Sequence, residues 1–192
     1  MAATNYSQTI KNDTKDFITT AILQLLGIQK TFEKPKNLAQ LTVSNVCKRA
    51  GVSRMAFYRN FESIDQVIYQ YYQPQISQSF EIIRQNVSAS SKIENQLKFF
   101  EEFKDDLFLS ESQGYEPIIR QIYIEEIEKF YEKTNDEYFI TFVANGVYAL
   151  WRKWLMNGQD KSIEEIHELI RKIFIFIFAE EISSAKIKAP EK

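Results

Sequence analysis

Two short helical patterns meet at a single glycine, Gly51, and this joint constrains the fold more than any other feature of the sequence. Thr42 can cap the first pattern, and Ser53 can cap the second, which begins at Arg54. Glycine adopts a left-handed backbone at little cost, so the chain can turn sharply between the two helices. Residues 42–61 therefore predict a helix-turn-helix, whose second helix can enter the major groove of DNA.

Glycine and proline are scarce in the chain, which has only five glycines and four prolines among 192 residues. An all-β fold needs more turn residues, and long stretches of this sequence repeat apolar residues at helical spacing. The sequence therefore predicts an all-α fold. We expect a polar arm at residues 1–12 and a first helix that begins at residue 12 or 13. The other predicted helices are 43–50, 54–60, one from 63 onward, 94–109, 117–132, 135–156 and 162–183.

Several classes of protein fit this sequence poorly. No apolar run reaches the ~18 residues that a membrane span needs, and the first residues lack a basic-then-apolar signal pattern. We therefore expect a cytoplasmic protein with no membrane partner. Cys47 is the single cysteine, which excludes a disulfide within the chain and a multi-cysteine metal site.

Charge is distributed unevenly along the chain. Residues 1–72 hold nine Lys/Arg and five Asp/Glu, a balance of +4, whereas residues 73–192 hold 15 and 21, a balance of −6. The two balances add to the net charge of −2. A positive head on an acidic body suits a protein that presents one end to phosphate groups.

An Ala-Gly-Val-Ser turn at the glycine joint is followed by the motif Phe-Tyr-x-x-Phe. This combination resembles the DNA-binding domain of TetR-family transcriptional regulators, and it is more specific than a helix-turn-helix pattern alone, which occurs in many proteins. The resemblance covers about residues 10–72 and is looser beyond them. The residues that carry it are Leu41, Thr42 and Val43, the turn Ala50 to Ser53, Phe57 to Phe61, and Ser63.

Candidate DNA contacts follow from the types and positions of the side chains. Thr42 begins a helix, where its hydroxyl and the free backbone amides can hold a phosphate, a role compatible with plain capping. Arg54 is the best candidate for base reading, because its planar guanidinium matches guanine O6 and N7, and Met55 can contact a thymine methyl group. Ser53 lies beside them at the start of the second helix. Arg59 and Asn60 are expected to contact the phosphate backbone of the DNA.

The resemblance adds one contact and shows two departures. The family's motif position corresponding to Tyr58 touches the phosphate backbone, although a packed tyrosine remains the alternative. Position 56 is Ala where the family often has Thr, and position 64 is Ile where it often has a phosphate-binding Lys. Lys48 and Arg49 are candidates to compensate for that lysine, or they are ordinary solvated charges.

Two wide apolar faces near the C-terminus predict a dimer interface. Their apolar surface is larger than one small helical domain readily buries. The resemblance also implies a homodimer built from the last two helices. The stretch 142–158 is similar to regulators of this family from low-GC Gram-positive bacteria, a group that includes activators of dihydroxyacetone metabolism. Mid-helix Gly146 costs roughly 1 kcal/mol relative to Ala, which close helix approach can offset. The interface candidates are Val147, Leu150, Trp154, Ile170, Phe174, Ile177 and Phe178.

A ligand pocket in the second domain is expected among the helices between residues 94 and 156. Aromatic residues at helical spacing are candidates for its wall, and they suit an apolar or flat ligand. The same spacing fits plain core packing, so both interpretations stay open. The candidates are Phe99, Phe103, Tyr115, Ile119, Tyr123, Phe139 and Phe142.

Enzymatic interpretations have little support in the sequence. His167 is the only histidine and has acidic neighbours at 164, 165 and 168, which favours a solvated helix face over a catalytic base or a metal ligand. Cys47 falls on the inner face of its helix, as a core residue does. No phosphate-binding glycine loop, nucleophile elbow or zinc motif is present in the sequence. We therefore expect no enzymatic activity, no cofactor and no metal site.

The leading hypothesis is a homodimeric transcriptional regulator, most often a repressor in this family. Residues 10–72 form its three-helix DNA-binding domain, and residues 73–185 form its helical effector-binding and dimerisation domain. It binds a near-palindromic operator, with an affinity that a small-molecule effector or a partner protein controls. The alternative is a helical adapter protein that does not bind DNA, or an activator that works with a partner protein.

Overall fold

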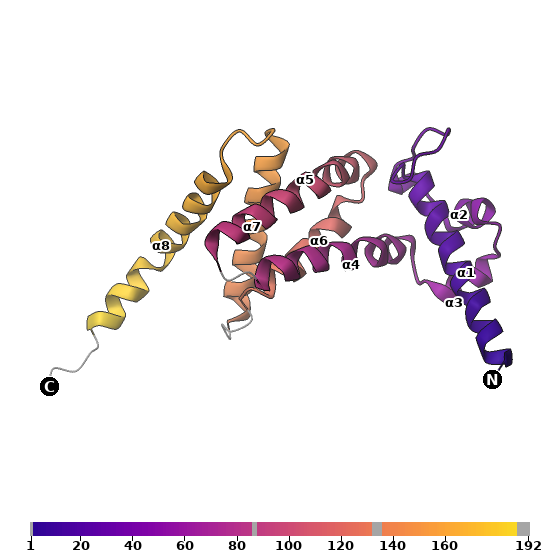
Figure 1. Cartoon of the computed structure of the whole chain (residues 1–192), viewed down its shortest axis with the longest axis horizontal. Helices are drawn as coiled ribbons and strands as arrows, with labels where there is room; N and C mark the ends of the chain where they lie inside the picture. The colour runs from indigo at the N-terminus through magenta and orange to yellow at the C-terminus, as the bar shows by residue number, and fades with distance from the viewer. Residues whose placement is uncertain (1, 86–87, 132–135, 188–192) are drawn as a thin grey trace.

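The computed structural model describes residues 2–85, 88–131 and 136–187, and within them the chain is entirely helical (Figure 1). This confirms the predicted all-α class. The described part contains one short 3-10 helix, η1 (Leu38–Gln40), and eight α-helices. Their bounds are α1 Ala2–Leu25, α2 Val43–Ala50, α3 Arg54–Asn60, α4 Ile64–Gln85, α5 Ala89–Gln113, α6 Glu116–Glu128, α7 Glu137–Met156 and α8 Ile163–Ile187.

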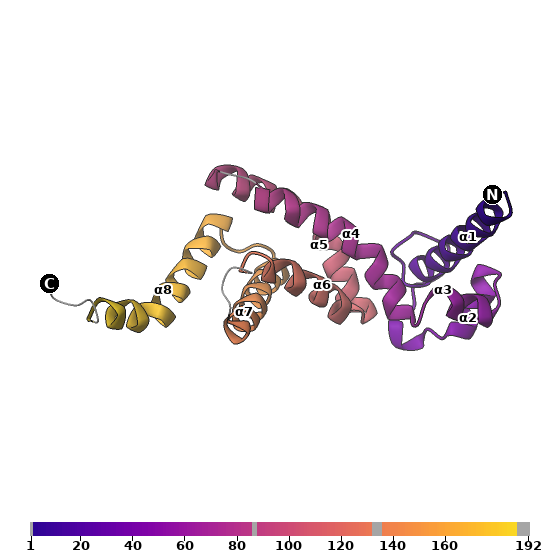
Figure 2. The same cartoon turned by 90° about the horizontal axis from the view of Figure 1, so that it is seen from below.

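Helices α1, α2 and α3 pack together at one end of the molecule (Figures 1 and 2). The bounds of α2 and α3 are those predicted, because Thr42, Gly51 and Ser53 act as the expected caps. The predicted polar arm at residues 1–12 is wrong from residue 2 onward, since α1 already begins at Ala2. No glycine or proline interrupts that stretch, so the helix continues toward the N-terminus.

Helix α4 is continuous and links this head to the remaining helices. It passes through Pro74, which is exposed, and so crosses the boundary expected at residues 72 and 73 without a break. One stripe of α4 is buried along its whole length, and the helix packs against α1, α5 and α6. The buried residues of this stripe are Val67, Ile68, Tyr72, Ile76, Phe80 and Ile83.

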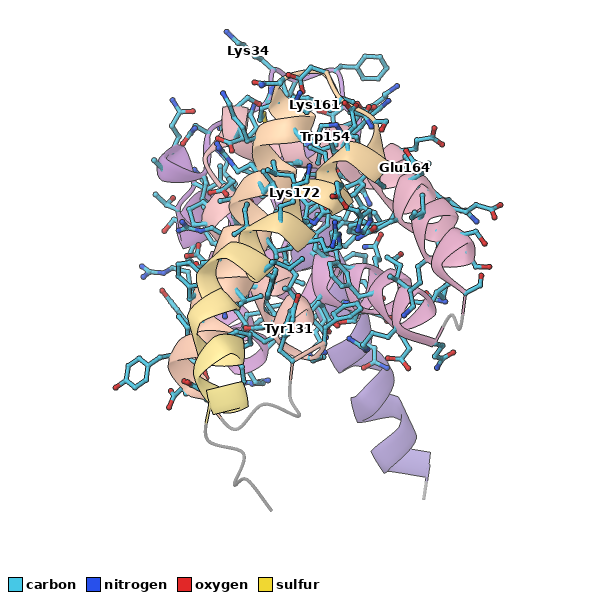
Figure 3. All side chains as sticks on the ribbon, turned by 90° about the vertical axis from the view of Figure 1, so that its left-hand side faces the viewer. Lys34, Tyr131, Trp154, Lys161, Glu164 and Lys172 are labelled. Atoms are coloured by element: carbon cyan, nitrogen blue, oxygen red, sulfur yellow. The ribbon has the colours of Figure 1, made fainter. Side chains whose placement is uncertain are left out.

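Helices α5, α6 and α7 form the middle of the molecule, and α8 lies at the end opposite the head (Figures 1 and 2). Helix α5 extends beyond its predicted range of 94–109 in both directions, because Ser88 caps its start and Gly114 ends it. At the turn into α8, the indole Nε1 of Trp154 donates a hydrogen bond to the Lys161 carbonyl at 2.8 Å. Figure 3 shows these two residues close together, with Tyr131 toward the other end of the bundle.

A buried carboxylate joins α4 to α6. Glu126 is 1% exposed, and its oxygens accept hydrogen bonds from Arg84 at 3.1 Å, from Lys129 at 2.5 Å and from the Ser77 hydroxyl. Burial by itself raises the pKa of the Glu126 carboxyl, but these hydrogen bonds hold the pKa below its ordinary value. Two of the three donors, Ser77 and Arg84, belong to α4, so the carboxylate holds the two helices in register.

The head and the body also meet at a second contact, between the loop before α2 and the corner between α5 and α6. The Asn37 side chain accepts a hydrogen bond from the Ala39 amide at 3.0 Å and donates one to the Ser112 carbonyl at 3.4 Å. Gly114 has a φ of +81°, and a Cβ atom there would lie 2.9 Å from the Asn37 amide group. A side chain at position 114 therefore meets both backbone strain and a collision.

Within the described residues, no helix combines the length and the apolar character needed to cross a bilayer.

We expect Gly114→Ala to destabilise the protein more than Gly158→Ala does. Both glycines have positive φ, +81° and +72°, but nothing lies within 4 Å of a Cβ built at Gly158. Backbone strain costs about 1 kcal/mol in each variant, and displacing Asn37 adds about 1 kcal/mol or more in Gly114→Ala. Urea denaturation measures both free energies of unfolding. Equal decreases in the free energy of unfolding of the two variants would show that the contact with Asn37 does not contribute to the difference.

Glu126→Gln is expected to lower the free energy of unfolding at pH 7 by about 1–3 kcal/mol. A carboxyl whose pKa is lower in the folded chain than its ordinary 4.5 stabilises the fold above that pH. The contribution disappears as the pH falls through the pKa of the folded state. The free energy of unfolding of Glu126→Gln should therefore be well below that of the unsubstituted protein at pH 7 and close to it at about pH 3. Denaturation at the two pH values measures both differences.

The exposed Glu101 provides a control, because Glu101→Gln removes the same charge from the surface of α5. Glu101→Gln should change stability by less than about 0.5 kcal/mol at either pH. A loss in Glu126→Gln that is the same at both pH values would contradict the role assigned to the Glu126 carboxylate.

Candidate nucleic-acid interface

The turn between α2 and α3 is fixed by capping groups at both of its ends. Thr42 caps α2: its hydroxyl accepts from the Asn45 amide at 3.2 Å, and its own amide donates to the Asn45 side chain at 3.0 Å. Gly51 ends α2 with a φ of +67°, as the sequence predicted for a left-handed turn. The Ser53 hydroxyl then accepts from the Ala56 amide at 3.1 Å and starts α3. These caps set the direction of α3 relative to α2.

Helix α3 has one buried face and one exposed face. Phe57 and Phe61 are 0% and 4% exposed and belong to the same core cluster as Val46 and Ile22. The opposite face consists of two pairs at a spacing of four residues, which places their side chains next to each other along the helix. These exposed residues are Arg54 with Tyr58, and Met55 with Arg59.

Two large side chains on this face remain in solvent. Met55 is 72% exposed and Tyr58 is 53% exposed. The Tyr58 ring touches the buried Phe57 edge-on, with ring centroids 5.4 Å apart, so Phe57 supports it from one side. The alternative of a packed tyrosine does not fit this exposure. An exposed methionine and tyrosine beside two arginines form a surface able to contact a partner.

Asn60 does not belong to this exposed face, contrary to its predicted role as a DNA contact. Its amide nitrogen donates to the Ala56 carbonyl at 2.7 Å. Its amide oxygen is buried without a hydrogen-bond partner among the described residues. The last turn of α3 directs the amide nitrogen back onto its own helix, and the amide oxygen is buried.

The two basic residues at the end of α2 differ in their surroundings. Lys48 is exposed, as a phosphate contact requires. Arg49 is partly buried and forms an ion pair with Glu33 at 2.6 Å, and its Nε donates to Gln24 at 3.0 Å. Arg49 therefore ties α2 to α1 and to the loop after it. Of the two residues, Lys48 alone has no ion pair within the described part of the chain.

The two departures from the family pattern have a structural context. Ile64, the first residue of α4, is half-buried and packs against the core, so an apolar side chain suits this position. Ala56 is also half-buried, and its backbone amide donates to the Ser53 hydroxyl. Neither position presents a polar side chain to the exposed face of α3.

The body contains an aromatic cavity of about 230 Å³, which we name the inner cavity. Side chains from α4, α5, α6, α7 and α8 line it, among them Phe80, Gln96, Phe99, Tyr123, Trp151 and His167. Phe99 and Tyr123 were predicted as pocket residues, and both line this cavity. Four further lining residues, Phe80, Gln96, Trp151 and His167, were not predicted from the sequence as pocket residues.

The remaining predicted pocket residues lie elsewhere. Tyr115 is fully buried and its hydroxyl lies 3.3 Å from that of Tyr72, while Ile119 is 2% exposed in the core. Phe103 packs on Phe99 with ring centroids 4.9 Å apart but does not line the cavity. Phe139 packs near Phe174, at 6.4 Å between centroids, and Phe142 is 59% exposed. These five residues do not line the inner cavity, because helical spacing does not distinguish core from cavity.

His167 was expected on a solvated face, and this expectation is wrong. It is half-buried, its Nε2 lies 2.6 Å from Oε1 of Gln96, and its ring meets Trp151 edge-on at 5.4 Å. A signal in the sequence existed: His167 lies four residues after Ile163 and three before Ile170, on the apolar stripe of α8. Of its acidic neighbours, Glu164 lies one turn before His167, but its own side chain is exposed.

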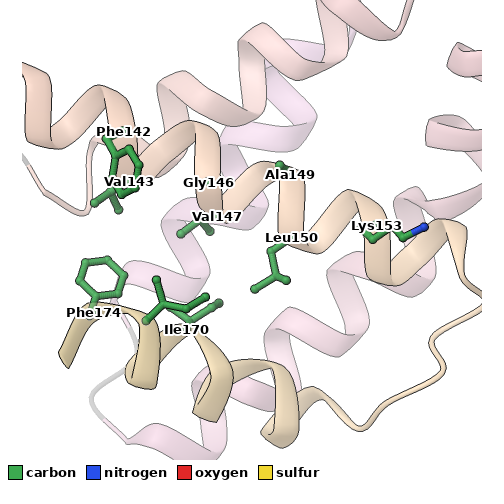
Figure 4. A pocket seen from close by; sticks show the side chains of 10 residues that line it. Phe142, Val143, Gly146, Val147, Ala149, Leu150, Lys153, Ile170 and Phe174 are labelled. Atoms are coloured by element: carbon green, nitrogen blue, oxygen red, sulfur yellow. The ribbon is translucent and has the colours of Figure 1, made fainter. Parts of the chain in front are cut away.

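A second concavity, the α7–α8 groove, has a volume of about 360 Å³. Val147 and Leu150 from α7 face Ile170 and Phe174 from α8 across it (Figure 4). These four residues were predicted at a dimer interface. Trp154 was predicted there too, but it is 3% exposed and packs against Phe100 and Trp151 inside its own chain. The side chains of Ile177 and Phe178 lie outside the described residues.

The groove is almost entirely apolar and opens to solvent. Lys153 is the only charged residue among those that line it, and Phe142 and Ile173 at its edge are 59% and 41% exposed. Gly146 also lines it, and nothing in the described part of the chain lies within 4 Å of a Cβ built there. No helix of the described chain therefore makes the close approach that was expected to offset this glycine.

A comparison with models of protein families finds none that matches this chain, and a comparison with curated proteins finds no matching sequence.

Proposed function

We propose that the protein is a DNA-binding transcriptional regulator of the TetR type, in which α3 reads the major groove. The observation that carries this proposal is the exposed face of α3. Arg54, Met55, Tyr58 and Arg59 line one side of a seven-residue helix whose other side is fixed in the core by Phe57 and Phe61. A rigid helix with an exposed, basic and partly aromatic face is the arrangement that groove recognition needs.

Each exposed side chain has a distinct role in this proposal. Arg54, in the first turn of α3, donates to guanine O6 and N7, and Met55 beside it contacts a thymine methyl group. Tyr58 and Arg59 hold the phosphate backbone on either side of the groove. At the start of α2, the Thr42 hydroxyl accepts from the Asn45 amide and keeps its own proton to donate to a phosphate.

Charge supports the same orientation. Residues 1–72 carry a balance of +4 and residues 73–192 a balance of −6. Because duplex DNA is densely negative, it attracts the head and repels the body. Lys48 adds a free positive charge next to α3, whereas Arg49 is neutralised by Glu33.

We also propose that the protein is a homodimer joined through the α7–α8 groove. An apolar surface that includes exposed Phe142 and Ile173 is costly to leave in water, and a second copy of the same groove can cover it. Gly146 fits this role, because the close approach that its missing side chain permits must come from another chain. A two-fold dimer would present two α3 helices to the two halves of a near-palindromic operator.

Under this proposal the protein acts as a cytoplasmic repressor whose operator affinity depends on an effector bound in the body. Effector binding shifts the dimer toward a state in which the two heads no longer match the operator spacing.

One observation favours a second candidate function. Met55 and Tyr58 are large, apolar and exposed, which also suits docking to a protein. In that case the head is an adapter surface and contacts no DNA. The two functions differ in whether the binding depends on the sequence of a DNA duplex.

Arg54→Ala is expected to weaken binding to a duplex recovered by selection from random sequences by about 1–3 kcal/mol. It should also relax the preference at one base pair, since Arg54 is assigned to a base edge. Tyr58→Phe should weaken binding by about 1 kcal/mol on every sequence, because it removes only a phosphate contact. Fluorescence anisotropy at several salt concentrations measures both effects.

Lys48→Ala and Lys98→Ala form a matched pair for this experiment. Both lysines are exposed, but Lys98 lies on α5 in the body and Lys48 on α2 in the head. Lys48→Ala should reduce the slope of log Kd against log salt concentration by about one. Lys98→Ala should leave this slope unchanged. Equal effects of the two substitutions would contradict the assigned orientation.

Phe142→Glu and Ile173→Glu are each expected to weaken the dimer about 100-fold, which corresponds to about 3 kcal/mol. A charge buried without a partner at a two-fold interface is present twice, which makes it costly. Both positions are already exposed in the single chain, so the fold should survive. Sedimentation equilibrium at micromolar concentration measures the dissociation constant.

Tyr138→Glu serves as the control. Tyr138 lies on α7, as Phe142 does, and is 88% exposed, but it does not line the groove. It should leave the dimer intact. If the original protein sediments as a monomer at tens of micromolar, the proposed dimer is wrong.

A further inference from the structure

One polar group of the inner cavity is the hydroxyl of Tyr123. Tyr123 is 4% exposed, lines the cavity and packs its ring against Phe80 and Phe99, with centroids 5.8 Å and 5.4 Å away. Among the residues that the structure describes, none forms a hydrogen bond with its hydroxyl. The Tyr123 hydroxyl can therefore donate to, or accept from, a molecule in the cavity.

Gln96 and His167 supply two more polar groups to the same cavity. The pair is joined by the 2.6 Å contact between Oε1 of Gln96 and Nε2 of His167. If His167 donates in this contact, the Gln96 amide keeps its N–H groups and His167 keeps an acceptor nitrogen. If the Gln96 amide is turned by 180°, its N–H donates to His167 instead, so Gln96 keeps an acceptor oxygen and His167 keeps a donor N–H. In both cases the pair retains one donor and one acceptor for another molecule.

The charge state of the cavity favours an uncharged occupant. Burial lowers the pKa of His167, against the opposing effect of nearby Glu164, so the imidazole is neutral at pH 7. Burial also raises the pKa of Tyr123, which stays protonated. Of the described residues that line the cavity, Lys92 alone is charged, and it is exposed. No carboxylate is among the residues that line it, although Asp106 and Glu164 lie near enough to act on Tyr123 and His167.

Shape and size restrict the occupant further. The cavity volume of about 230 Å³ is below the roughly 300–1,000 Å³ of drug-sized pockets, which leaves room for one or two rings. Aromatic walls such as Phe80, Phe99 and Trp151 offer stacking and edge contacts to a flat molecule.

We propose that the inner cavity binds a small, flat, uncharged aromatic molecule that hydrogen-bonds to Tyr123 and to the Gln96–His167 pair. The molecule carries both a donor and an acceptor, as a primary amide or a lactam does. Its role as the effector rests on the proposed function, but its binding does not.

The test is a calorimetric titration of the full chain, without DNA, with three probes of the same ring system. 2-Naphthamide carries an uncharged donor and acceptor, 2-naphthoate carries a charge, and naphthalene carries no polar group. We expect one 2-naphthamide per chain, bound at least tenfold more tightly than either of the other two. No binding of 2-naphthamide up to 1 mM, or tighter binding of 2-naphthoate, would overturn the proposal.

Tyr123→Phe and Gln96→Leu separate recognition from structure. Each should weaken 2-naphthamide binding about tenfold, because one hydrogen bond is lost, and each should leave naphthalene binding unchanged or tighter. Tyr138→Phe is the control, since Tyr138 is exposed and does not line the cavity. Unchanged 2-naphthamide binding in both cavity variants would overturn the assignment. Because no DNA is present, this result is independent of whether the head binds DNA.

Discussion

Helix α4 packs against α1 near one end and against α5 and α6 along the rest, and its buried stripe is unbroken across Pro74. Only three residues, 61–63, separate it from α3. The position of α4 therefore sets the position of the exposed face of α3. The Glu126 carboxylate holds the far half of α4 through Ser77 and Arg84. Because the head and the body both pack on this one helix, a displacement of α4 acts on both.

The same helix gives the proposed regulation a physical route. Phe80 of α4 lines the inner cavity and touches Tyr123 of α6, so a molecule in the cavity contacts α4 directly. A small shift of α4 would change the direction of α3 and the contact between Asn37 and the corner at Gly114. In a dimer, such a shift would alter the distance between the two heads.

Local signals in the sequence predicted much of this structure, and long-range packing accounts for what they missed. The ends of α2 and α3 were predictable because Thr42, Gly51 and Ser53 determine their own backbone geometry. The exposed face of α3 followed from helical spacing, but the inward direction of Asn60 did not, because it depends on a single hydrogen bond to Ala56.

The cavity was harder to predict than the head. Helical spacing shows that an aromatic residue faces inward, but it does not show whether protein or empty space lies opposite. Tyr115 meets Tyr72 and is core, while Tyr123 faces a cavity assembled from five helices. Trp154 and His167 were misassigned for the same reason, since their partners Phe100 and Gln96 lie more than 50 residues away along the chain.

The proposed function requires that two copies of α3 read the two halves of one DNA site. A selection from random duplex DNA tests this requirement, with the purified protein at ~150 mM salt, where non-specific phosphate binding is weak. We expect an enriched inverted repeat with half-sites about one helical turn apart, or slightly more. A protein that is folded and dimeric but enriches no sequence would contradict this expectation and favour the adapter function.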